Sequence, residues 1–282
     1  MMNNIQNLDE LIKMALSEDI GDGDHSTLAC IPCEAVDNAK MVAKQDGILC
    51  GVEVGEKVFK SVDDTLKVIC LMHDGDVVKS GDVIMLIEGH SRAILTAERT
   101  ALNFMQRLSG IATQTNKMVK MLEGTRTRLL DTRKTTPNMR LLEKYAVKCG
   151  GGTNHRIGLY DMIMLKDNHI DFAGGIESAI DRTRQYLEDN GKQLKIEVEV
   201  RNLEELQRVM THGGVDRVML DNFDVPTLAE AVRIIDGRFE TEASGGITDA
   251  TLRQYAETGV DFISVGALTH HIKSLDISLI KR

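Results

Sequence analysis

From about residue 125 onward, short apolar runs with β-strand character alternate with segments of helical periodicity. This alternation constrains the fold strongly, because it is the arrangement that builds parallel strands joined by right-handed helical crossovers. The expected strands span residues 128–132, 161–166, 194–200, 217–221, 238–244 and 261–266. The sequence therefore predicts an α/β fold of the (β/α) barrel type.

The helices between these strands have recognisable starts and stops. Pro137 and Pro226 are expected in first helical turns, and Asn202 followed by Glu205 predicts an N-cap with its capping-box partner. The three glycines at 150–152 are expected to end the first of these helices. A longer helix is expected over residues 96–119, leading towards the barrel.

Residues 1–112 have a different pattern: a leading amphipathic segment and then short alternating runs interrupted by glycines. This pattern suits a small mixed sheet and predicts a smaller N-terminal α+β sandwich domain. Residues 113–269 are expected to form the catalytic barrel domain, and residues 270–282 are expected to pack back on the N-terminal domain.

Composition narrows the class of protein. A chain of 282 residues with 42% hydrophobic content can bury a large core. It contains no apolar run of about 18 residues and no signal-like N-terminal segment, so we expect a cytoplasmic protein without membrane partners. The absence of Trp, the 4% aromatic content and the lack of a basic tail argue against nucleic-acid binding. The five cysteines are expected to be reduced structural thiols, because the Cys30–Cys33 pair lacks a second pair at zinc spacing.

Positive charge is concentrated in residues 131–170. This segment contains seven Lys or Arg and four Asp or Glu, whereas the whole chain has a net charge of −9. A local reversal of sign in an acidic protein favours a site for a small, highly anionic ligand. Lys144 and Lys148 are excluded from this site, because with Glu143 they are expected on a solvated helix face.

Reactive groups of a (β/α) barrel come from the C-terminal ends of its strands. Here the early strands end in cations, the middle strands in carboxylates and the last two in glycines. In chain order these ends carry Thr132, Arg133, Lys134, Lys166, Glu199, Asp221, Ser244, Gly245, Gly246 and Gly266.

Each of the three groups suits a different part of a ligand. Gly245–Gly246 and Gly266–Ala267 allow backbone N–H groups to approach a phosphate. Glu199 and Asp221 are hard oxygen donors for Mg²⁺, bound directly or through water, or for ribose hydroxyls. The expected donors to carboxylates are Arg133, His155 and Arg156. Because Glu197 and Glu199 share one strand face, that face could instead point into a layered core, where a carboxylate needs a partner.

Eight motifs resemble those of the quinolinate phosphoribosyltransferase family, also called nicotinate-nucleotide pyrophosphorylase (carboxylating). They are EDIGDGDHST (18–27), ERTALNFMQRLSGIAT (98–113), DTRKTTPNMR (131–140), KCGGGTNHRIGLYDMIMLKDNH (148–169), EVEV (197–200), MLDNF (219–223), EASGGIT (242–248) and ISVGALTH (263–270). The resemblance implies transfer of phosphoribosyl from phosphoribosyl pyrophosphate to quinolinate with loss of CO₂, giving nicotinate mononucleotide and pyrophosphate in de novo NAD biosynthesis.

The resemblance also implies roles for individual residues. Arg133, His155, Arg156 and Lys166 resemble the group that grips the quinolinate carboxylates. Lys134 and Lys166 would face phosphoribosyl pyrophosphate, and Glu199 and Asp221 would face its ribose and Mg²⁺. These last four are the expected catalytic residues. The expected 5′-phosphate contacts are Ser244, Gly245, Gly246, Val265, Gly266 and Ala267, with His270 near the same rim.

Assembly is implied in the same way. Arg99 resembles an arginine that the family delivers across a homodimer interface to the neighbouring site. The sequence does not decide whether the assembly is a dimer or a hexamer. Asn138 departs from the family pattern, which usually has Gly, although Asn tolerates a left-handed turn.

Two alternative functions remain to be weighed against the quinolinate enzyme. One is a molybdenum-transport-associated relative of the same fold with a different acceptor. The other is a non-catalytic sensor of a phosphorylated metabolite. The full set of cations and carboxylates at the strand ends favours the quinolinate enzyme over both.

Overall fold

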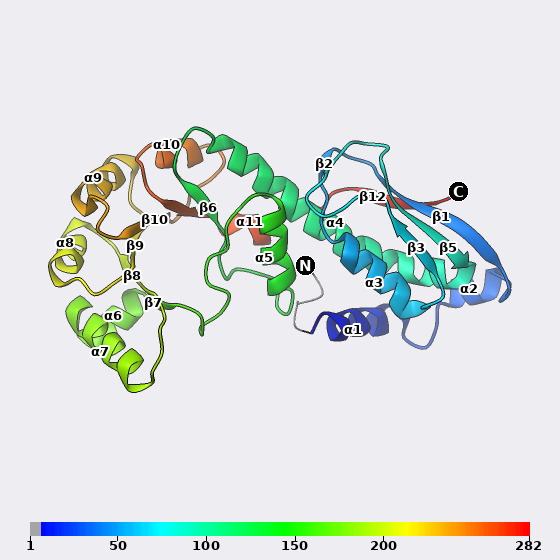
Figure 1. The fold of residues 1–282 in the computed structure, drawn as a ribbon, viewed down its shortest axis with the longest axis horizontal. Helices are drawn as coiled ribbons and strands as arrows, with labels where there is room; N and C mark the ends of the chain where they lie inside the picture. Colours follow the sequence, from blue (N-terminus) through cyan, green and yellow to red (C-terminus); the bar gives the residue numbers. More distant parts are fainter. Residues whose placement is uncertain (1–6) are drawn as a thin grey trace. The chain divides into compact units, whose positions relative to one another are not determined.

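The computed structural model describes residues 7–282, which form two compact units (Figure 1). The first unit comprises the described residues up to Asn116, together with Thr135–Gly151 and Leu268–Arg282. The second comprises Lys117–Lys134 and Gly152–Ala267. Each unit contains its own sheet.

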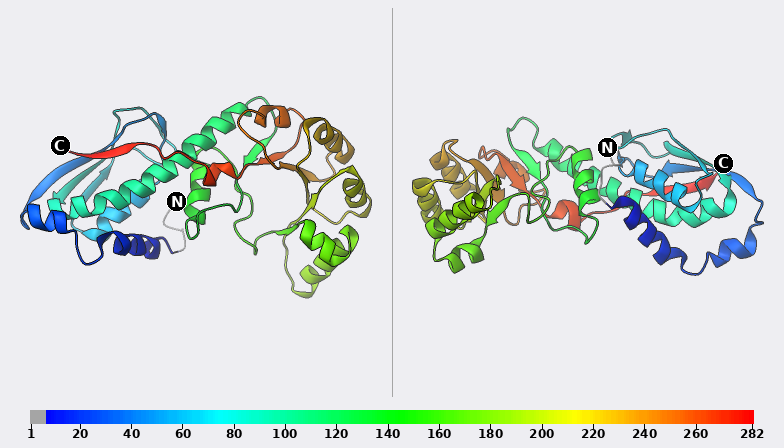
Figure 2. Two further views of the ribbon diagram at one scale, coloured as in Figure 1. Left: turned by 180° about the vertical axis from the view of Figure 1, so that it is seen from behind. Right: turned by 60° about the horizontal axis from the view of Figure 1, so that its bottom comes forward.

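The first unit is built on an antiparallel sheet with the strand order β12-β1-β5-β3 (Figures 1 and 2). Its strands are β1 (Val36–Ala43), β3 (Lys67–Cys70), β5 (Val83–His90) and β12 (Ile277–Lys281), and a separate pair joins β2 (Gly47–Ile48) to β4 (Val77–Val78). Since β12 pairs with β1, the last strand of the sequence lies at the edge of the sheet that contains the first.

The helices of this unit are α1 (Leu8–Ile20), α2 (His25–Cys30), α3 (Val52–Val62), α4 (Ser91–Met121), α5 (Arg140–Cys149) and α11 (Ala267–His270), whose first residue belongs to the second unit. Two of them, α3 and α4, pack on one face of the sheet. Met41 of β1 lies opposite Met85 of β5, and both side chains are fully buried. A side chain at Gly55 of α3 would meet Met105 of α4 and Met85, so the two helices pack closely on this face.

The second unit contains a parallel sheet of six strands in the order β6-β11-β10-β9-β8-β7. These are β6 (Arg128–Leu130), β7 (Ile163–Leu165), β8 (Ile196–Val200), β9 (Arg217–Asp221), β10 (Glu240–Ser244) and β11 (Phe262–Ser264). Their connections contain α6 (Asp167–Ala173), α7 (Ile176–Asp189), α8 (Leu203–His212), α9 (Val225–Ile235) and α10 (Leu252–Ala256). All six expected strands are confirmed, and the first lies beside the last, as in an α/β barrel.

One pairing on β6 was not expected. Thr153 forms a parallel bridge with Leu130, and its N–H donates to the carbonyl of Leu129 at 2.8 Å. The segment after the glycine run at 150–152 is therefore aligned along the second edge of β6. This alignment matters for the site, because the residues that follow Thr153 are carried to the same end of the sheet.

Two of the expected helix starts are confirmed. The Asn202 side chain accepts the N–H of Glu205 at 2.9 Å, although the Glu205 carboxylate returns to the N–H of Arg201 rather than to that of Asn202. Pro226 lies in the first turn of α9, behind the N-cap Asp224. The expectation for Pro137 is wrong, since α5 begins only at Arg140.

Pro137 belongs instead to a tight turn that precedes α5. The N–H of Met139 donates to the carbonyl of Thr136 at 3.1 Å, and Asn138 between them has a φ of 63°. Proline followed by a residue with positive φ is the pattern of a type II turn. This conformation explains why Asn can stand where the resembling family usually has Gly.

The expected solvated face of α5 is wrong for two of its three residues. Glu143 is fully buried, and its carboxylate accepts from the guanidinium of Arg107 at 2.7 Å. Lys144 is also buried, whereas Lys148 is exposed as expected. Through these contacts α5 packs in the first unit, so residues 135–151 group there rather than with the expected barrel domain.

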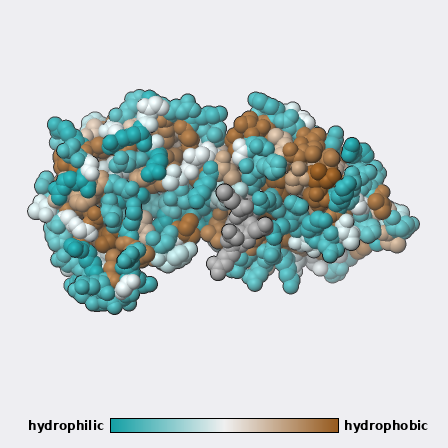
Figure 3. Space-filling model, in the orientation of Figure 1, coloured by the Kyte–Doolittle hydropathy of each residue, from teal (hydrophilic) through white to brown (hydrophobic). Residues whose placement is uncertain are grey.

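Hydrophilic residues predominate on the face of both units shown in Figure 3, with hydrophobic residues interspersed. Within residues 7–282, no helix combines the length and apolar composition needed to cross a bilayer. The five cysteines are free thiols.

Candidate functional site

The C-terminal ends of the parallel strands bring four of the predicted residues to one rim of the second unit. Lys166 follows β7, and Glu199 is the second-last residue of β8. The Lys166 Nζ is 4.0 Å from the Glu199 Oε2. Asp221 ends β9, directly opposite Ser244 in the register of β10. The rim is therefore formed by adjacent strands in the order that the sequence predicts.

Two carboxylates at this rim carry raised pKa values. Burial raises the pKa of Glu199 above its usual range, and the negative charge of Asp221 raises it further. Burial also raises the pKa of Asp221, against the opposing effects of the Asn222 side chain and Lys166. Two half-buried carboxylates that repel one another would be stabilised by a bound cation.

The loop after β10 is shaped for close approach of a ligand. The N–H of Asn222 donates to the carbonyl of Ser244 at 2.8 Å, and a Cβ on Gly245 would lie only 2.1 Å from the Asn222 side-chain oxygen. Only glycine fits there. Gly246 has a φ of 62° with open space where a side chain would be, so its backbone is accessible.

Asp131, at the end of β6, organises the cationic part of the rim. Its buried carboxylate accepts the N–H of His155 at 2.8 Å and the Asn154 side-chain amide at 2.5 Å. These bonds hold the segment after Thr153 beside the end of β6. Sequence reasoning missed Asp131 as a site residue, although its place at the end of an apolar strand was a usable signal.

Arg133 lies close enough to Arg156 to affect it electrostatically. Burial lowers the pKa of Arg156, and the positive charge of Arg133 lowers it further. Arg156 is oriented by a hydrogen bond from Nη1 to the carbonyl of Met162 at 3.3 Å. Two neighbouring guanidinium groups on a protein of net charge −9 are suited to bind a dianionic ligand.

His155 is buried in the interior of the second unit, with its side chain 5% exposed. Its Nε2 lies 3.0 Å from Glu197 and 3.2 Å from Glu242, while its Nδ1 lies 2.6 Å from the backbone nitrogen of Arg156. Burial alone would lower the pKa of His155, but the two carboxylates raise it to about 9. Both ring nitrogens thus face protein groups, and direct contact of His155 with a substrate stays a prediction.

Arg217 completes this buried ion network. Its guanidinium lies 3.2 Å from Glu242 and 3.0 Å from Glu240, and it stacks over the ring of Phe262 at 4.2 Å. The alternative that this face of β8 points into the core is therefore confirmed for Glu197, which is fully buried. Glu199, by contrast, reaches the rim. The sequence did not identify Glu242 and Arg217 as members of a buried network. Glu240 and Glu242 are nevertheless two residues apart on β10, as Glu197 and Glu199 are on β8.

The remaining predicted residues lie in different surroundings. The N–H of Val265 donates to the carbonyl of Leu130 at 3.0 Å, so it is used by the sheet, and Gly266 and Ala267 follow it at partly exposed positions. Thr132 accepts the N–H of Lys134 at 3.0 Å, and Lys134 is exposed. Arg99 and His270 are exposed residues of the first unit.

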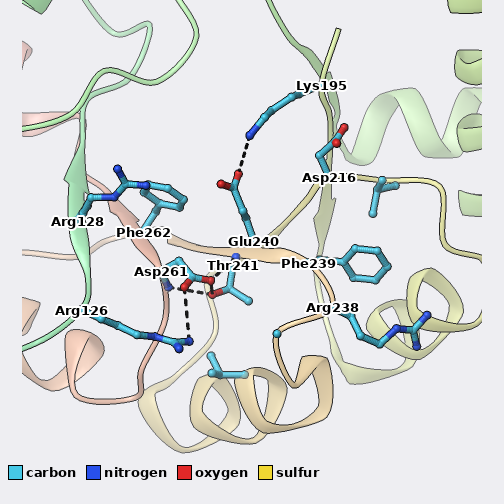
Figure 4. A pocket seen from close by; sticks show the side chains of 13 residues that line it. Arg126, Arg128, Lys195, Asp216, Arg238, Phe239, Glu240, Thr241, Asp261 and Phe262 are labelled. Atoms are coloured by element: carbon cyan, nitrogen blue, oxygen red, sulfur yellow. Dashed lines mark hydrogen bonds and ion pairs between the residues drawn. The ribbon is translucent and has the colours of Figure 1, made fainter. Parts of the chain in front are cut away.

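A cavity of about 620 Å³ lies at the opposite, N-terminal ends of the strands (Figure 4). Its polar groups largely pair with one another: Lys195 lies 3.3 Å from Glu240, and Asp261 accepts from the Thr241 hydroxyl at 2.7 Å. Because barrel chemistry is concentrated at the C-terminal ends, the rim and not this cavity is the candidate active site.

Comparison with known proteins identifies the family. Residues 24–109 match the family model described as the N-terminal domain of quinolinate phosphoribosyl transferase, and residues 111–280 match that of its C-terminal domain.

Similar full-length proteins carry the same description. A quinolinate phosphoribosyltransferase [decarboxylating] 2b, mitochondrial, of Nicotiana tabacum is 47% identical over 96% of this chain and 81% of the relative. A probable nicotinate-nucleotide pyrophosphorylase [carboxylating] of Bacillus subtilis is 42% identical over 99% and 94%. The fold is similar to that of the nicotinate-nucleotide pyrophosphorylase from Francisella tularensis, with a TM-score of 0.93, 43% identity and coverage of 100% of this chain and 99% of that chain. This chain therefore belongs to the quinolinate phosphoribosyltransferase family.

Proposed function

We propose that this chain transfers the phosphoribosyl group of phosphoribosyl pyrophosphate to quinolinate and releases pyrophosphate and CO₂, forming nicotinate mononucleotide for NAD biosynthesis. The observation that carries the assignment is the placement of Arg156 close to Arg133, whose positive charge lowers the pKa of Arg156. Two guanidinium groups can bind two carboxylates, whereas an acceptor with one carboxylate would need only one of them. Family membership supports the same reaction.

Acceptor binding is the first task of these residues. Arg133 and Arg156 hold the two carboxylates of quinolinate, with Lys166 as a further positive charge at the rim. His155 supports this grip by position, because its Nε2 is held beside Glu197 while its Nδ1 lies against the backbone of Arg156. Fixing both carboxylates orients the ring nitrogen towards the anomeric carbon.

Departure of pyrophosphate leaves positive charge on the ribose, and the rim supplies charge on both sides of the bond that breaks. Lys134 and Lys166 stabilise the leaving anion, and Glu199 and Asp221 lie on the side of the ribose. The repulsion and burial of these two carboxylates fit a Mg²⁺ ion, which they would hold directly or through water. When bound, Mg²⁺ supplies charge stabilisation for the pyrophosphate.

The glycine loops bind the other end of the donor. The open backbone of Gly246 and its neighbours Ser244 and Gly245, with Gly266 and Ala267 after β11, suits the 5′-phosphate. Binding energy from this remote phosphate positions the ribose for attack.

Decarboxylation follows from the first step. Once the ring nitrogen is bonded to the ribose it is positively charged, and this charge stabilises the electron pair left at C2 when CO₂ departs. The C–CO₂ bond breaks without proton transfer, and the electron pair at C2 then takes a proton from solvent to give nicotinate mononucleotide. Positioning and charge, rather than acid–base catalysis, account for the chemistry of the rim in this proposal.

We further propose a cytoplasmic homodimer in which Arg99 reaches the site of the neighbouring subunit. Arg99 is exposed on α4. The loop between Arg156 and Lys166 exposes Leu159 by 72% and Tyr160 by 71%, and large apolar side chains at such exposure favour a protein partner.

The direct test is an assay of the purified protein with phosphoribosyl pyrophosphate, Mg²⁺ and quinolinate, with nicotinate and nicotinamide as control acceptors. Nicotinate mononucleotide and pyrophosphate should form with quinolinate only. Equal turnover of nicotinate would contradict the dicarboxylate grip. Tight binding of phosphoribosyl pyrophosphate without product from any acceptor would instead favour the transport-associated relative or a sensor.

A further inference from the structure

A second cluster of possible metal ligands lies in the first unit and shares no residue with the barrel rim. The Sγ atoms of Cys50 and Cys149 and a carboxylate oxygen of Asp74 all lie within 4.8 Å of one another. Cys50 precedes α3, Asp74 lies in the turn between β3 and β4, and Cys149 ends α5. Three segments distant in sequence therefore converge on one point.

Hydrogen bonds from the surrounding protein fix the first two ligands. The N–H of Cys50 donates to the hydroxyl oxygen of Ser109 at 2.9 Å, and this hydroxyl donates back to the Cys50 carbonyl at 3.0 Å. The Asp74 carboxylate accepts the N–H of Val52 at 2.8 Å and the hydroxyl of Tyr145 at 3.1 Å. Outer contacts of this kind orient the ligands of protein metal sites.

A glycine follows each cysteine and lets the chain pack tightly on α4. A Cβ on Gly51 would lie 2.9 Å from Leu108, and one on Gly150 would lie 2.4 Å from the carbonyl of Ala112. The backbone on both sides of the cluster is thereby anchored to the same helix. The positions of both sulfur atoms are consequently set by packing rather than by exposed loops.

The Asp74 carboxylate lies beside two thiols, and its hydrogen bonds come from neutral groups. They are donated by the backbone amide of Val52 and by the phenol of Tyr145, neither of which carries a positive charge. A divalent cation is the partner that would neutralise this combination.

We propose that Cys50, Cys149 and Asp74 form a binding site for a thiophilic divalent cation of the zinc class. Two thiolates and one carboxylate are a donor set for such an ion, with water as the fourth ligand. Both thiols release their protons to solvent as the two metal–sulfur bonds form. Mg²⁺ prefers an all-oxygen environment, so this site differs in selectivity from the pair Glu199 and Asp221.

The test uses the full chain, reduced and freed of metal, with Cys30, Cys33 and Cys70 changed to Ser. These changes leave the cluster as the only source of thiolates and remove the exposed Cys30–Cys33 pair as a competing site. Titration with Zn²⁺ and with Co²⁺ should give one ion per chain, cobalt–thiolate charge-transfer absorption, and a raised midpoint of thermal unfolding. Absence of stoichiometric binding by this reduced protein would overturn the proposal.

Variants then assign the ligands. Cys149→Ser, with Cys149→Ala as a second version, should abolish stoichiometric binding, and circular dichroism would verify that each protein is folded. Tyr145→Phe removes the hydroxyl that bonds to Asp74 and also contacts Cys149, and should weaken binding on the order of 10–100-fold. Unchanged binding in both Cys149 variants would mean that the ion binds elsewhere and would contradict the assignment. The quinolinate assay with Mg²⁺ is a separate readout, so failure of this proposal leaves the proposed reaction intact.

Discussion

His155 is a buried cation in the interior of a barrel, and its charge is balanced locally. Its Nε2 lies beside Glu197 and Glu242, and Arg217 pairs with Glu242 and with Glu240. Removing any one of them would leave an unpaired buried charge, which costs more than the net stabilisation of the network. The network supports Arg156 through the ring of His155.

This environment predicts a loss of stability in mildly alkaline solution. The pKa of His155 is raised from 6.5 to about 9 in the folded protein, so its contribution is complete below pH 6.5 and is lost as pH rises through about 9. The free energy of unfolding, measured by urea denaturation across this range, should fall. In Glu242→Gln one acceptor is lost, and the fall should move to lower pH. His90→Gln, at an exposed histidine, is the matched control, and identical profiles for all three proteins would contradict the role of the network.

The rim residues predict a loss of activity without unfolding. Lys134→Ala or Asp221→Ala should lower kcat on the order of 10²–10³-fold, because each removes charge that faces the breaking glycosidic bond. Lys148→Ala, at an exposed lysine of α5, should keep normal turnover. Initial rates with quinolinate, together with thermal unfolding, test both statements; near-normal turnover in either rim variant would refute its assigned role.

At the scale of elements, the turn before α5 links a sequence departure to stability. Asn138 has a φ of 63°, which most residues adopt only at a cost of about 1–2 kcal/mol. Asn138→Ala should therefore lower the free energy of unfolding by about 1 kcal/mol, whereas Asn138→Gly should stay close to the parent protein. Urea denaturation of the three proteins is the measurement, and an Ala variant as stable as the Gly variant would show that the turn relaxes.

The parallel strands were predictable because each is a short apolar run with a polar residue at its end. Pro137 was not, because proline suits both a first helical turn and the second position of a turn, and only the positive φ of Asn138 decides between them. The buried side of α5 was also beyond local reasoning. Glu143 is buried because Arg107, 36 positions away, lies against it.

Much of the rim followed from strand ends, since parallel strands place their C-terminal ends together. The supporting residues did not. Asp131 acts through Asn154 and His155, which reach it only after Thr153 pairs with β6. The position of Glu242 beside His155 depends on strand register, which no single strand reveals.

For the whole molecule, the proposed dimer predicts complementation between two inactive variants. Arg99→Ala lacks the arginine for its neighbour's site, and Asp221→Ala lacks a carboxylate of its own site. A mixed dimer contains one complete site, so equal amounts of exchanged subunits should recover about one quarter of normal activity. Co-expression with two affinity tags yields the mixed dimer for assay. No recovery in the isolated mixed dimer would mean that Arg99 does not act across an interface.

The pairing of β12 with β1 has a consequence for the order in which the protein is made. Every strand of the barrel is synthesised before β12, so the outer edge of β1 has no permanent partner while the barrel can already assemble. An open strand edge is a template for pairing with other chains. During synthesis, the sheet most exposed to misassociation is therefore the N-terminal one. Its first strand is synthesised early but gains its last partner only when β12 is made.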